Sequence, residues 1–251
     1  MKKIFPLLLV IMLLAACGRK GVLVPPEGLV PAQVSELQLS QRGAGLQLSW
    51  TMPNKMASGG KLTDLAGFRV MRREVLPPAE DCEQCPDAYR LLKMVDLAYL
   101  QGASRLGGQL YLLDTEVTAK TTYQYRVSAV NKDGESGIIS SPVRGTVIPP
   151  LPSPRLSATA TPTGVELHVS AAPLPTGATL IGFTIYRVKK GGTFSPIPIT
   201  PQPITTPTYE DSRLERGIVY TYVAGVEATI NGERIESVLS PPIAISMAEP
   251  D

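Results

Sequence analysis

The stretch Thr122-Tyr-Gln-Tyr-Arg-Val-Ser-Ala-Val-Asn131 alternates apolar and polar residues over most of its length. Successive side chains of a β-strand point to opposite faces, so this alternation predicts a strand with one apolar and one polar face. The apolar face would carry Tyr123, Tyr125, Val127 and Ala129, and the polar face Gln124, Arg126 and Ser128. Because such a strand must bury its apolar face, we expect two stacked sheets.

Part of this stretch is one of four sequence blocks that occur twice in the same order. The matching blocks are residues 45–50 with 164–169, 67–72 with 182–187, 123–127 with 220–224, and Ser141-Pro142 with Ser240-Pro241. Turn residues separate short alternating runs, and no long helical periodicity occurs, which is typical of a sandwich or barrel. The sequence therefore predicts an all-β protein with two copies of one module. The first copy carries an insertion, roughly residues 76–87.

Length and charge narrow the class of protein. The chain has 251 residues, which suggests one large or two small domains. Its 24 basic and 22 acidic residues give a net charge of +2, without the basic stripe of a nucleic-acid-binding protein. With one histidine and three cysteines, neither a histidine-based catalytic centre nor a multi-histidine metal site is expected.

Residues 1–16 have the pattern of a secretory signal peptide. Lys2 and Lys3 precede an apolar run of 11 residues, Ile4 to Leu14. That run is shorter than the about 20 residues that a membrane-spanning helix needs. It ends in Leu14-Ala-Ala-Cys17, and this ending resembles the bacterial lipobox. An ordinary signal peptide followed by a chance cysteine is the alternative.

The lipobox resemblance implies that Cys17 becomes the first residue and carries a diacylglycerol and an N-acyl chain such as palmitate. No other cofactor is expected. By the same resemblance, Gly18 in place of Asp favours the outer membrane, where we expect the periplasmic face. Loss of Lys2 and Lys3 leaves 22 basic against 22 acidic residues, so the acyl chains rather than charge would hold the protein on the membrane.

The first copy resembles fibronectin type III domains, which are immunoglobulin-like sandwiches. The resemblance is carried by Trp50-Thr-Met-Pro53, Gly67-Phe-Arg-Val70, the stretch 122–131 and the turn Asp133-Gly134. It covers residues 31–149 and 150–248, after a lipidated stalk of residues 17–30. The expected fold is therefore all-β, with two tandem fibronectin type III sandwiches after a signal peptide and an irregular stalk.

The same resemblance implies structural roles for three aromatic residues. Trp50 would be the core tryptophan, and Tyr123 the tyrosine corner at the start of a late strand. Tyr220 is the counterpart of Tyr123 in the second copy. That copy has Val169 in place of the tryptophan and Gly225 within its late strand, so we expect its core to be less stable.

Prolines dominate the connection between the copies, residues 147–154. Proline fixes φ and favours an extended path of about 3.1 Å per residue. This composition predicts a semi-rigid spacer and an elongated molecule of two separate bodies. Direct continuation of the last strand of one copy into the first strand of the next is compatible with it.

Cys82 and Cys85 form a Cys-x-x-Cys pair in the insertion. In an oxidising envelope a small structural disulfide is the default. A redox dithiol and half of a zinc site are the alternatives. The segment lacks the helix start that lowers a redox thiol pKa, and further zinc ligands are missing because His168 is remote.

No other residues form a catalytic or metal-binding pattern. His168 lies between Leu167 and Val169 and is expected on a solvent-facing side of its strand. Asp114 and Asp211 precede the late strand at matching places, which favours a structural turn role over catalysis. Nucleophile elbows, phosphate loops and His-Glu-x-x-His motifs do not occur in the sequence.

The stalk resembles a short motif, Cys-Gly-x-Lys-Gly-Pro-Leu-x-x-Pro-Pro, of a small lipoprotein that assists maturation of the lipopolysaccharide translocon. Val22 departs from the usual proline, and one spacer residue is missing. A generic extended tether is the alternative. The residues that could contact a partner are Cys17, Gly18, Lys20, Gly21, Leu23, Pro25 and Pro26.

These features predict a non-enzymatic, lipid-anchored envelope protein that binds or scaffolds through fibronectin type III modules. Its partners would be the membrane, through the lipid anchor, and an envelope protein or glycan. Nucleic acid and small-molecule substrates are not expected. The alternatives are an assembly factor for the lipopolysaccharide translocon and accessory domains of a secreted carbohydrate-active system.

Overall fold

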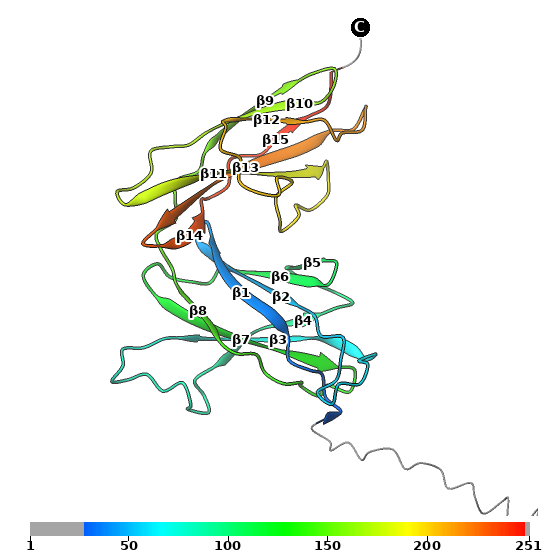
Figure 1. Ribbon diagram of the computed structural model, residues 1–251, viewed down its shortest axis with the longest axis vertical. Coiled ribbons are helices and arrows are strands. Elements are labelled where there is room, and N and C mark those ends of the chain that lie inside the picture. Colours follow the sequence, from blue (N-terminus) through cyan, green and yellow to red (C-terminus); the bar gives the residue numbers. More distant parts are fainter. Residues whose placement is uncertain (1–27, 249–251) are drawn as a thin grey trace, which may run out of the picture.

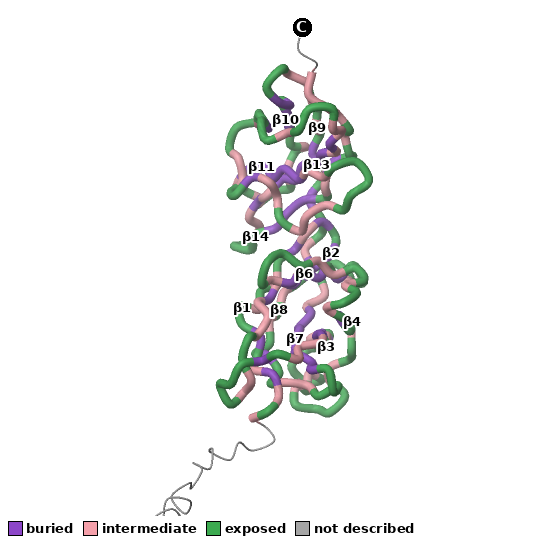
Figure 2. Tube along the Cα trace, turned by 90° about the vertical axis from the view of Figure 1, so that its right-hand side faces the viewer, coloured by how far each residue is buried: buried purple, intermediate pink, exposed green. Residues whose placement is uncertain are grey.

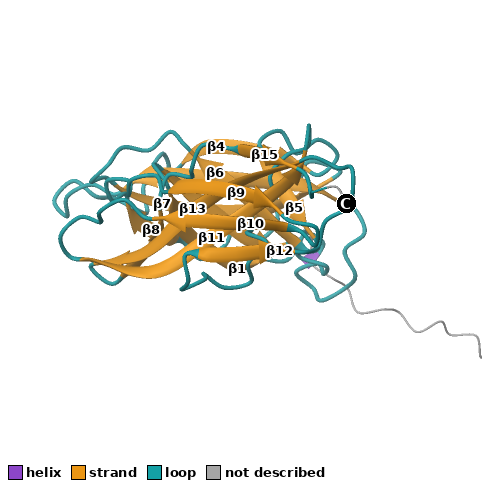
Figure 3. Cartoon of the chain, turned by 90° about the horizontal axis from the view of Figure 1, so that it is seen from above, coloured by secondary structure: helices purple, strands orange, loops and turns teal. Residues whose placement is uncertain are grey.

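The repeated alternating blocks form strands in a computed structural model that describes residues 28–248. This part of the chain consists of fifteen strands joined by loops and turns, with a short 3₁₀-helical turn at Gly28 and no α-helix (Figure 3). The strands form sandwich-like sheets, so the prediction of an all-β protein with two tandem fibronectin type III sandwiches is confirmed. Among residues 28–248 no helix is long and apolar enough to cross a membrane.

We call strands β1–β8 module 1. Its strands are β1 (Ser35–Arg42), β2 (Gly45–Thr51), β3 (Leu65–Glu74), β4 (Arg90–Asp96), β5 (Ala103–Leu106), β6 (Gln109–Asp114), β7 (Thr122–Asn131) and β8 (Val143–Thr146). One sheet has the order β1-β2-β6-β5 and the facing sheet the order β4-β3-β7-β8. Between them Trp50 and Phe68 pack edge to face, with ring centroids 5.6 Å apart.

We call strands β9–β15 module 2. Its strands are β9 (Arg155–Ala160), β10 (Val165–Ser170), β11 (Ala178–Lys189), β12 (Thr208–Asp211), β13 (Tyr220–Ile230), β14 (Glu233–Glu236) and β15 (Ile243–Ile245). The sheet β12-β10-β9 faces a sheet in which β13 pairs with β11, β14 and β15. Val169 occupies the core position expected for a tryptophan and is fully buried.

The two modules share one sheet. The end of β1 pairs in parallel with β14, with Gln41 opposite Ile235 and Arg42 opposite Glu236. The order β11-β13-β14-β1-β2-β6-β5 therefore runs from module 2 into module 1 without a break. Figures 1 and 2 show the modules stacked along the long axis, with β1 and β14 meeting between them.

The proline-rich connection is not a free spacer, which corrects our prediction of two separate bodies. Leu151 is 1% exposed and forms a small core with Ala228 and Ile235 of module 2. The Gln41 side-chain amide donates to the Ile148 carbonyl at 2.6 Å and accepts from its N–H at 2.8 Å. Apolar packing and paired backbone groups thus fix the connection, although the molecule is elongated as expected.

The predicted polar face of β7 is also only partly solvated. Gln124 and Ser128 are each 5% exposed, whereas the sequence pattern predicted both on a solvent-facing side. Gln124 is covered because it hydrogen-bonds to Glu83 of the insertion between β3 and β4 and to Arg73 at the end of β3. Strand alternation reports which residues share a face, and it does not reveal what a distant insertion places over that face.

Candidate functional site

The insertion between β3 and β4, residues 75–89, is folded back against the outer face of the four-stranded sheet. We call this segment the arch. Arg73, at the end of β3, makes two hydrogen bonds to the Asp81 carboxylate, at 2.5 and 3.0 Å. Its Nε donates to Gln124 of β7 at 2.7 Å. Because the Arg73 side chain is only 5% exposed, this ion pair fixes the arch to the sheet.

A second group of side chains holds the far end of the arch. Glu83 accepts hydrogen bonds from Arg126 at 2.5 Å and from Gln124 at 3.1 Å. The Tyr89 ring lies near both arginines, 4.5 Å from the Arg126 guanidinium and 5.7 Å from that of Arg73. Cation–π attraction therefore adds to the ion pairs, and the arch has a defined shape.

The Arg73 pair also shifts two pKa values. The hydrogen bond from Arg73 holds the Asp81 pKa below its ordinary value. The hydrogen bond to Asp81 in turn raises the Arg73 pKa. Both shifts favour the charged forms, so the Arg73–Asp81 ion pair persists at neutral pH.

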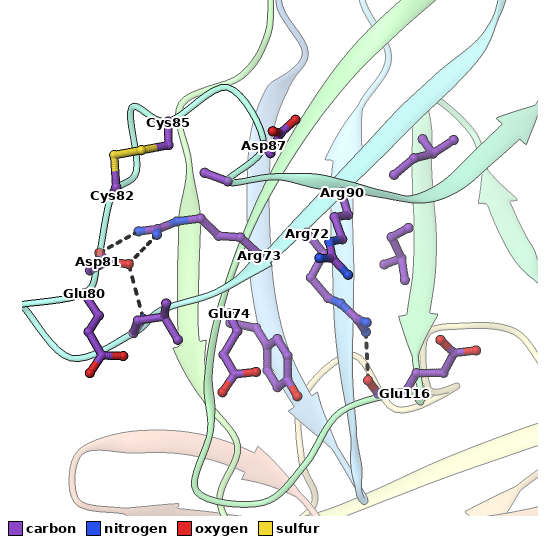
Figure 4. Close-up of a pocket in the computed structure, with 15 residues that line it drawn as sticks. Arg72, Arg73, Glu74, Glu80, Asp81, Cys82, Cys85, Asp87, Arg90 and Glu116 are labelled. Carbon is purple, nitrogen blue, oxygen red and sulfur yellow. Dashed lines mark hydrogen bonds and ion pairs between the residues drawn. A yellow bond between two sulfur atoms is a disulfide. The ribbon is translucent and has the colours of Figure 1, made fainter.

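A disulfide between Cys82 and Cys85 closes the tip of the arch, as the sequence predicted. The Cys85 N–H also donates to the Cys82 carbonyl at 3.2 Å, so the bridge spans a single turn. Figure 4 shows the bridge above the Arg73–Asp81 pair. Among the described residues no group of three or more histidines, cysteines or carboxylates could hold a metal ion.

The arch forms one wall of an open cleft of about 710 Å³. Figure 4 shows Arg72 and Arg90 close together in it, and Arg72 donates to the Glu116 carbonyl at 2.8 Å. The walls combine charged residues with Leu76, Leu91 and Leu92. Such a mixed surface can bind a polar and apolar segment of another molecule.

Both expected turn aspartates are ion-paired, with partners that we did not predict from the sequence. Asp114 accepts hydrogen bonds from Arg72 at 2.8 Å and from the Tyr125 hydroxyl at 2.9 Å. Asp211 does the same in module 2, with Arg187 at 2.7 Å and the Tyr222 hydroxyl at 2.9 Å. The sequence did contain a signal for these pairs, because the arginine and the tyrosine both recur at matching positions of the repeated blocks.

These aspartates are 4% and 2% exposed, so their charge is compensated by arginine rather than by water. Each also accepts a hydrogen bond from the backbone N–H two residues later, as a turn aspartate does. Burial raises the pKa of Tyr125 and Tyr222 above the ordinary range, and the neighbouring carboxylate adds to the shift.

The three aromatic residues with expected structural roles lie as follows. Trp50 is fully buried in the core of module 1. The Tyr123 hydroxyl accepts a hydrogen bond from the Thr118 N–H at 3.2 Å, and the Tyr220 hydroxyl accepts one from the Glu215 N–H at 3.1 Å. His168 is exposed on β10.

The last repeated block is shifted by one residue from our alignment. Ser240 accepts a hydrogen bond from the Ala224 N–H at 3.0 Å through its hydroxyl. The residue that does this in module 1 is Ser140, which accepts from the Val127 N–H at 2.9 Å. Ser140 rather than Ser141 is therefore the structural counterpart of Ser240.

The contact between the modules centres on Arg42, at the end of β1. Its Nε donates to the Glu236 carboxylate at 2.7 Å, and its guanidinium lies 4.8 Å from the centre of the Tyr186 ring. Arg42 Nη1 donates to Gln47 at 2.6 Å and to the Pro196 carbonyl at 2.9 Å. One arginine of module 1 thus joins three elements of module 2.

Glu236 is buried and receives further hydrogen bonds inside module 2. The Thr184 hydroxyl and the Tyr186 hydroxyl both donate to its Oε1, the latter at 2.7 Å. Gly225 on β13 leaves the space for this carboxylate, since a Cβ there would lie 2.8 Å from Glu236 Oε1. The glycine that marked the departure of the second copy therefore has a role at the junction.

The lipid anchor expected at Cys17, the expected stalk contacts and the predicted signal peptide lie outside the described residues. No protein-family model matches the chain, and no curated protein matches it. One of 544 matching solved chains contains the FN1–FN3 domains of chicken CNTN1. It is 15% identical, with a TM-score of 0.35, and the match covers 88% of this chain and 69% of that chain. The fold assignment rests on the strand order and the cores described above.

Proposed function

We propose that this protein is a non-enzymatic, lipid-anchored envelope protein that presents two rigidly joined modules to a binding partner. The fold is of a kind that suits a binding or scaffold role. The observation that carries this proposal is the continuous sheet across the junction, together with the Arg42–Glu236 ion pair. A rigid body of this kind can hold a binding surface at a fixed place relative to its anchor.

The placement of the chain supports this role. The described part of the chain begins at the end of module 1 that lies away from module 2, at the blue end of the ribbon in Figure 1. The buried carboxylates Asp114, Asp211 and Glu236 are engaged by arginine and tyrosine partners. Their commitment to structural ion pairs supports a non-catalytic role.

Lipid attachment can be tested at Cys17. In cells given labelled palmitate, the parent chain should incorporate label and fractionate with the outer membrane. The variant Cys17→Ser should remain an unprocessed precursor without label, because the acceptor thiol is absent. Ser153→Ala provides a matched control with an unchanged lipobox. Normal labelling and fractionation of Cys17→Ser would overturn the anchor.

The stalk motif favours a second candidate, an assembly factor for the lipopolysaccharide translocon. Deletion of residues 18–26 with Cys17 retained should leave the binding body functional under the first proposal. Under the second proposal, the same deletion should lower the amount of mature translocon. Crosslinking from Lys20 in intact cells would identify the molecule that touches the stalk.

A further inference from the structure

The two modules differ at one corresponding sheet edge, which another segment covers in module 2 and which is open in module 1. In module 2 the strand β11 is bordered by residues 196–204, whose backbone bonds to β11 through Ile199 and Ile204. This covering segment contains Pro196, Pro198, Pro201 and Pro203. Proline has no N–H to donate, so it prevents further strands from adding at that edge.

In module 1 the corresponding place is occupied by β4, the end strand of its sheet. No proline occurs between residues 90 and 103. The Leu97 N–H bonds inward to the Ala66 carbonyl at 3.0 Å. Because backbone groups alternate along a strand, Met94 and Asp96 point their N–H groups outward. Within residues 28–248 the outward groups of Met94 have no backbone hydrogen-bond partner.

The side chains of β4 differ in character between its two faces. Leu91 and Met94 lie opposite Met71 and Arg69 on the outer face, and they are 53% and 46% exposed. Arg90 and Lys93 pair with residues that point to the other face. In the described part of the chain none of Arg69, Arg90 and Lys93 makes an ion pair.

We propose that β4 is a docking edge for an extended segment of a partner protein with alternating acidic and apolar residues. Such a segment would add as a further strand, with its main chain paired to both backbone groups of Met94 and to the Asp96 N–H, because the Asp96 carbonyl already accepts from the Tyr99 N–H at 3.2 Å. Its apolar side chains would lie beside Leu91 and Met94, and its carboxylates beside Arg90 and Lys93. A second copy of β4 is disfavoured because Lys93 would oppose Lys93 in an antiparallel pair centred there.

This inference rests on the proposed binding role, and it can fail while the anchor and the junction stand. The test uses the full lipidated chain in nanodiscs and a fluorescent peptide of alternating Glu and Val. We expect saturable binding, with added exchange protection at the Met94 and Asp96 amides. A matched Lys/Val peptide should bind about tenfold more weakly or worse, as should the Glu/Val peptide N-methylated on alternate amides.

Two variants separate the backbone contribution from the charge contribution. Met94→Pro removes one outward N–H and should weaken Glu/Val binding severalfold, whereas Met94→Thr keeps the N–H and should bind nearly as the parent does. Lys93→Glu should shift the preference toward the Lys/Val peptide even if Met94→Pro folds poorly. Equal binding of both peptides by the parent chain, protection confined to other strands, or absence of saturable binding would overturn the proposal.

Discussion

Modules 1 and 2 share the same sandwich fold, and they differ in the features that lie at their surfaces and at the junction between them. Both hold a buried aspartate with an arginine and a tyrosine, and both have a tyrosine hydroxyl that caps a backbone N–H. Module 1 alone has the arch and the core tryptophan, and its strand β4 lacks the proline-rich cover that borders β11 in module 2. Module 2 alone has the Gly225 and Glu236 arrangement that receives Arg42. The shared parts maintain the sandwich, and the differing parts determine its contacts.

The difference between the two hydrophobic cores predicts the largest effect on the free energy of unfolding. Trp50→Ala should destabilise module 1 by about 3–5 kcal/mol, because a fully buried indole leaves a cavity. Val169→Ala removes far less volume and should cost module 2 about 1–2 kcal/mol. Urea unfolding followed by circular dichroism measures the loss in both variants, and Trp50 fluorescence in the second variant shows whether module 1 is unaffected. Equal losses would contradict the larger contribution that we assign to the buried indole.

Removal of either buried aspartate should cost about 3 kcal/mol, since each leaves an arginine and a tyrosine hydroxyl without their partner. Asp114→Ala tests module 1 and Asp211→Ala tests module 2, with the exposed Asp133→Ala as control. The free energy of unfolding from denaturant melts is the measurement. Losses below about 1 kcal/mol in both variants would show that arginine pairing contributes little to the fold.

Gly225→Ala should destabilise module 2 by about 1–3 kcal/mol, because the new Cβ would lie 2.7 Å from the Thr184 hydroxyl oxygen. The equivalent residue of β7 is Ser128, which already carries a side chain, so Ser128→Ala is the matched control. Thermal unfolding compares the two. An unchanged melting temperature in Gly225→Ala would mean that Glu236 can move without cost.

The tyrosine hydroxyls should contribute equally in the two modules. Tyr123→Phe and Tyr220→Phe each delete one hydrogen bond and should cost about 0.5–1.5 kcal/mol. Tyr99→Phe, at a residue that is 67% exposed, should cost nothing measurable. A loss in only one of the two modules would contradict the shared role of this residue.

The arch should loosen in acid, a property that module 2 lacks. Arg73 holds the Asp81 pKa below its ordinary value of 3.8, so its contribution is present above that value and is lost as the pH falls through the lowered pKa. The Leu76 amide donates to Asp81 at 3.2 Å, and its proton chemical shift reports the change. Asp81→Asn should abolish this titration, whereas Asp87→Asn should preserve it.

The sequence predicted what depends on local alternation and repetition. Strands such as β7 and β10 and the exposed His168 follow from the period-2 pattern, and the core role of Trp50 follows from the resemblance to fibronectin type III domains. The pairing of Arg42 with Glu236 could not be predicted, because 194 residues separate them and neither residue has a local signal. The cover over Gln124 was missed for the same reason, since tertiary placement of the arch decides it.

The most direct test of the rigid junction is a distance measurement between the modules. Spin labels are attached at Lys61→Cys in module 1 and Lys190→Cys in module 2, in a Cys17→Ser chain. Pulsed electron paramagnetic resonance then measures the distance between the two labels. Both positions are exposed. We predict one narrow distance distribution for this chain and a broader one when Arg42→Ala and Glu236→Ala are added. A distribution equally broad with and without the Arg42–Glu236 pair would contradict the account.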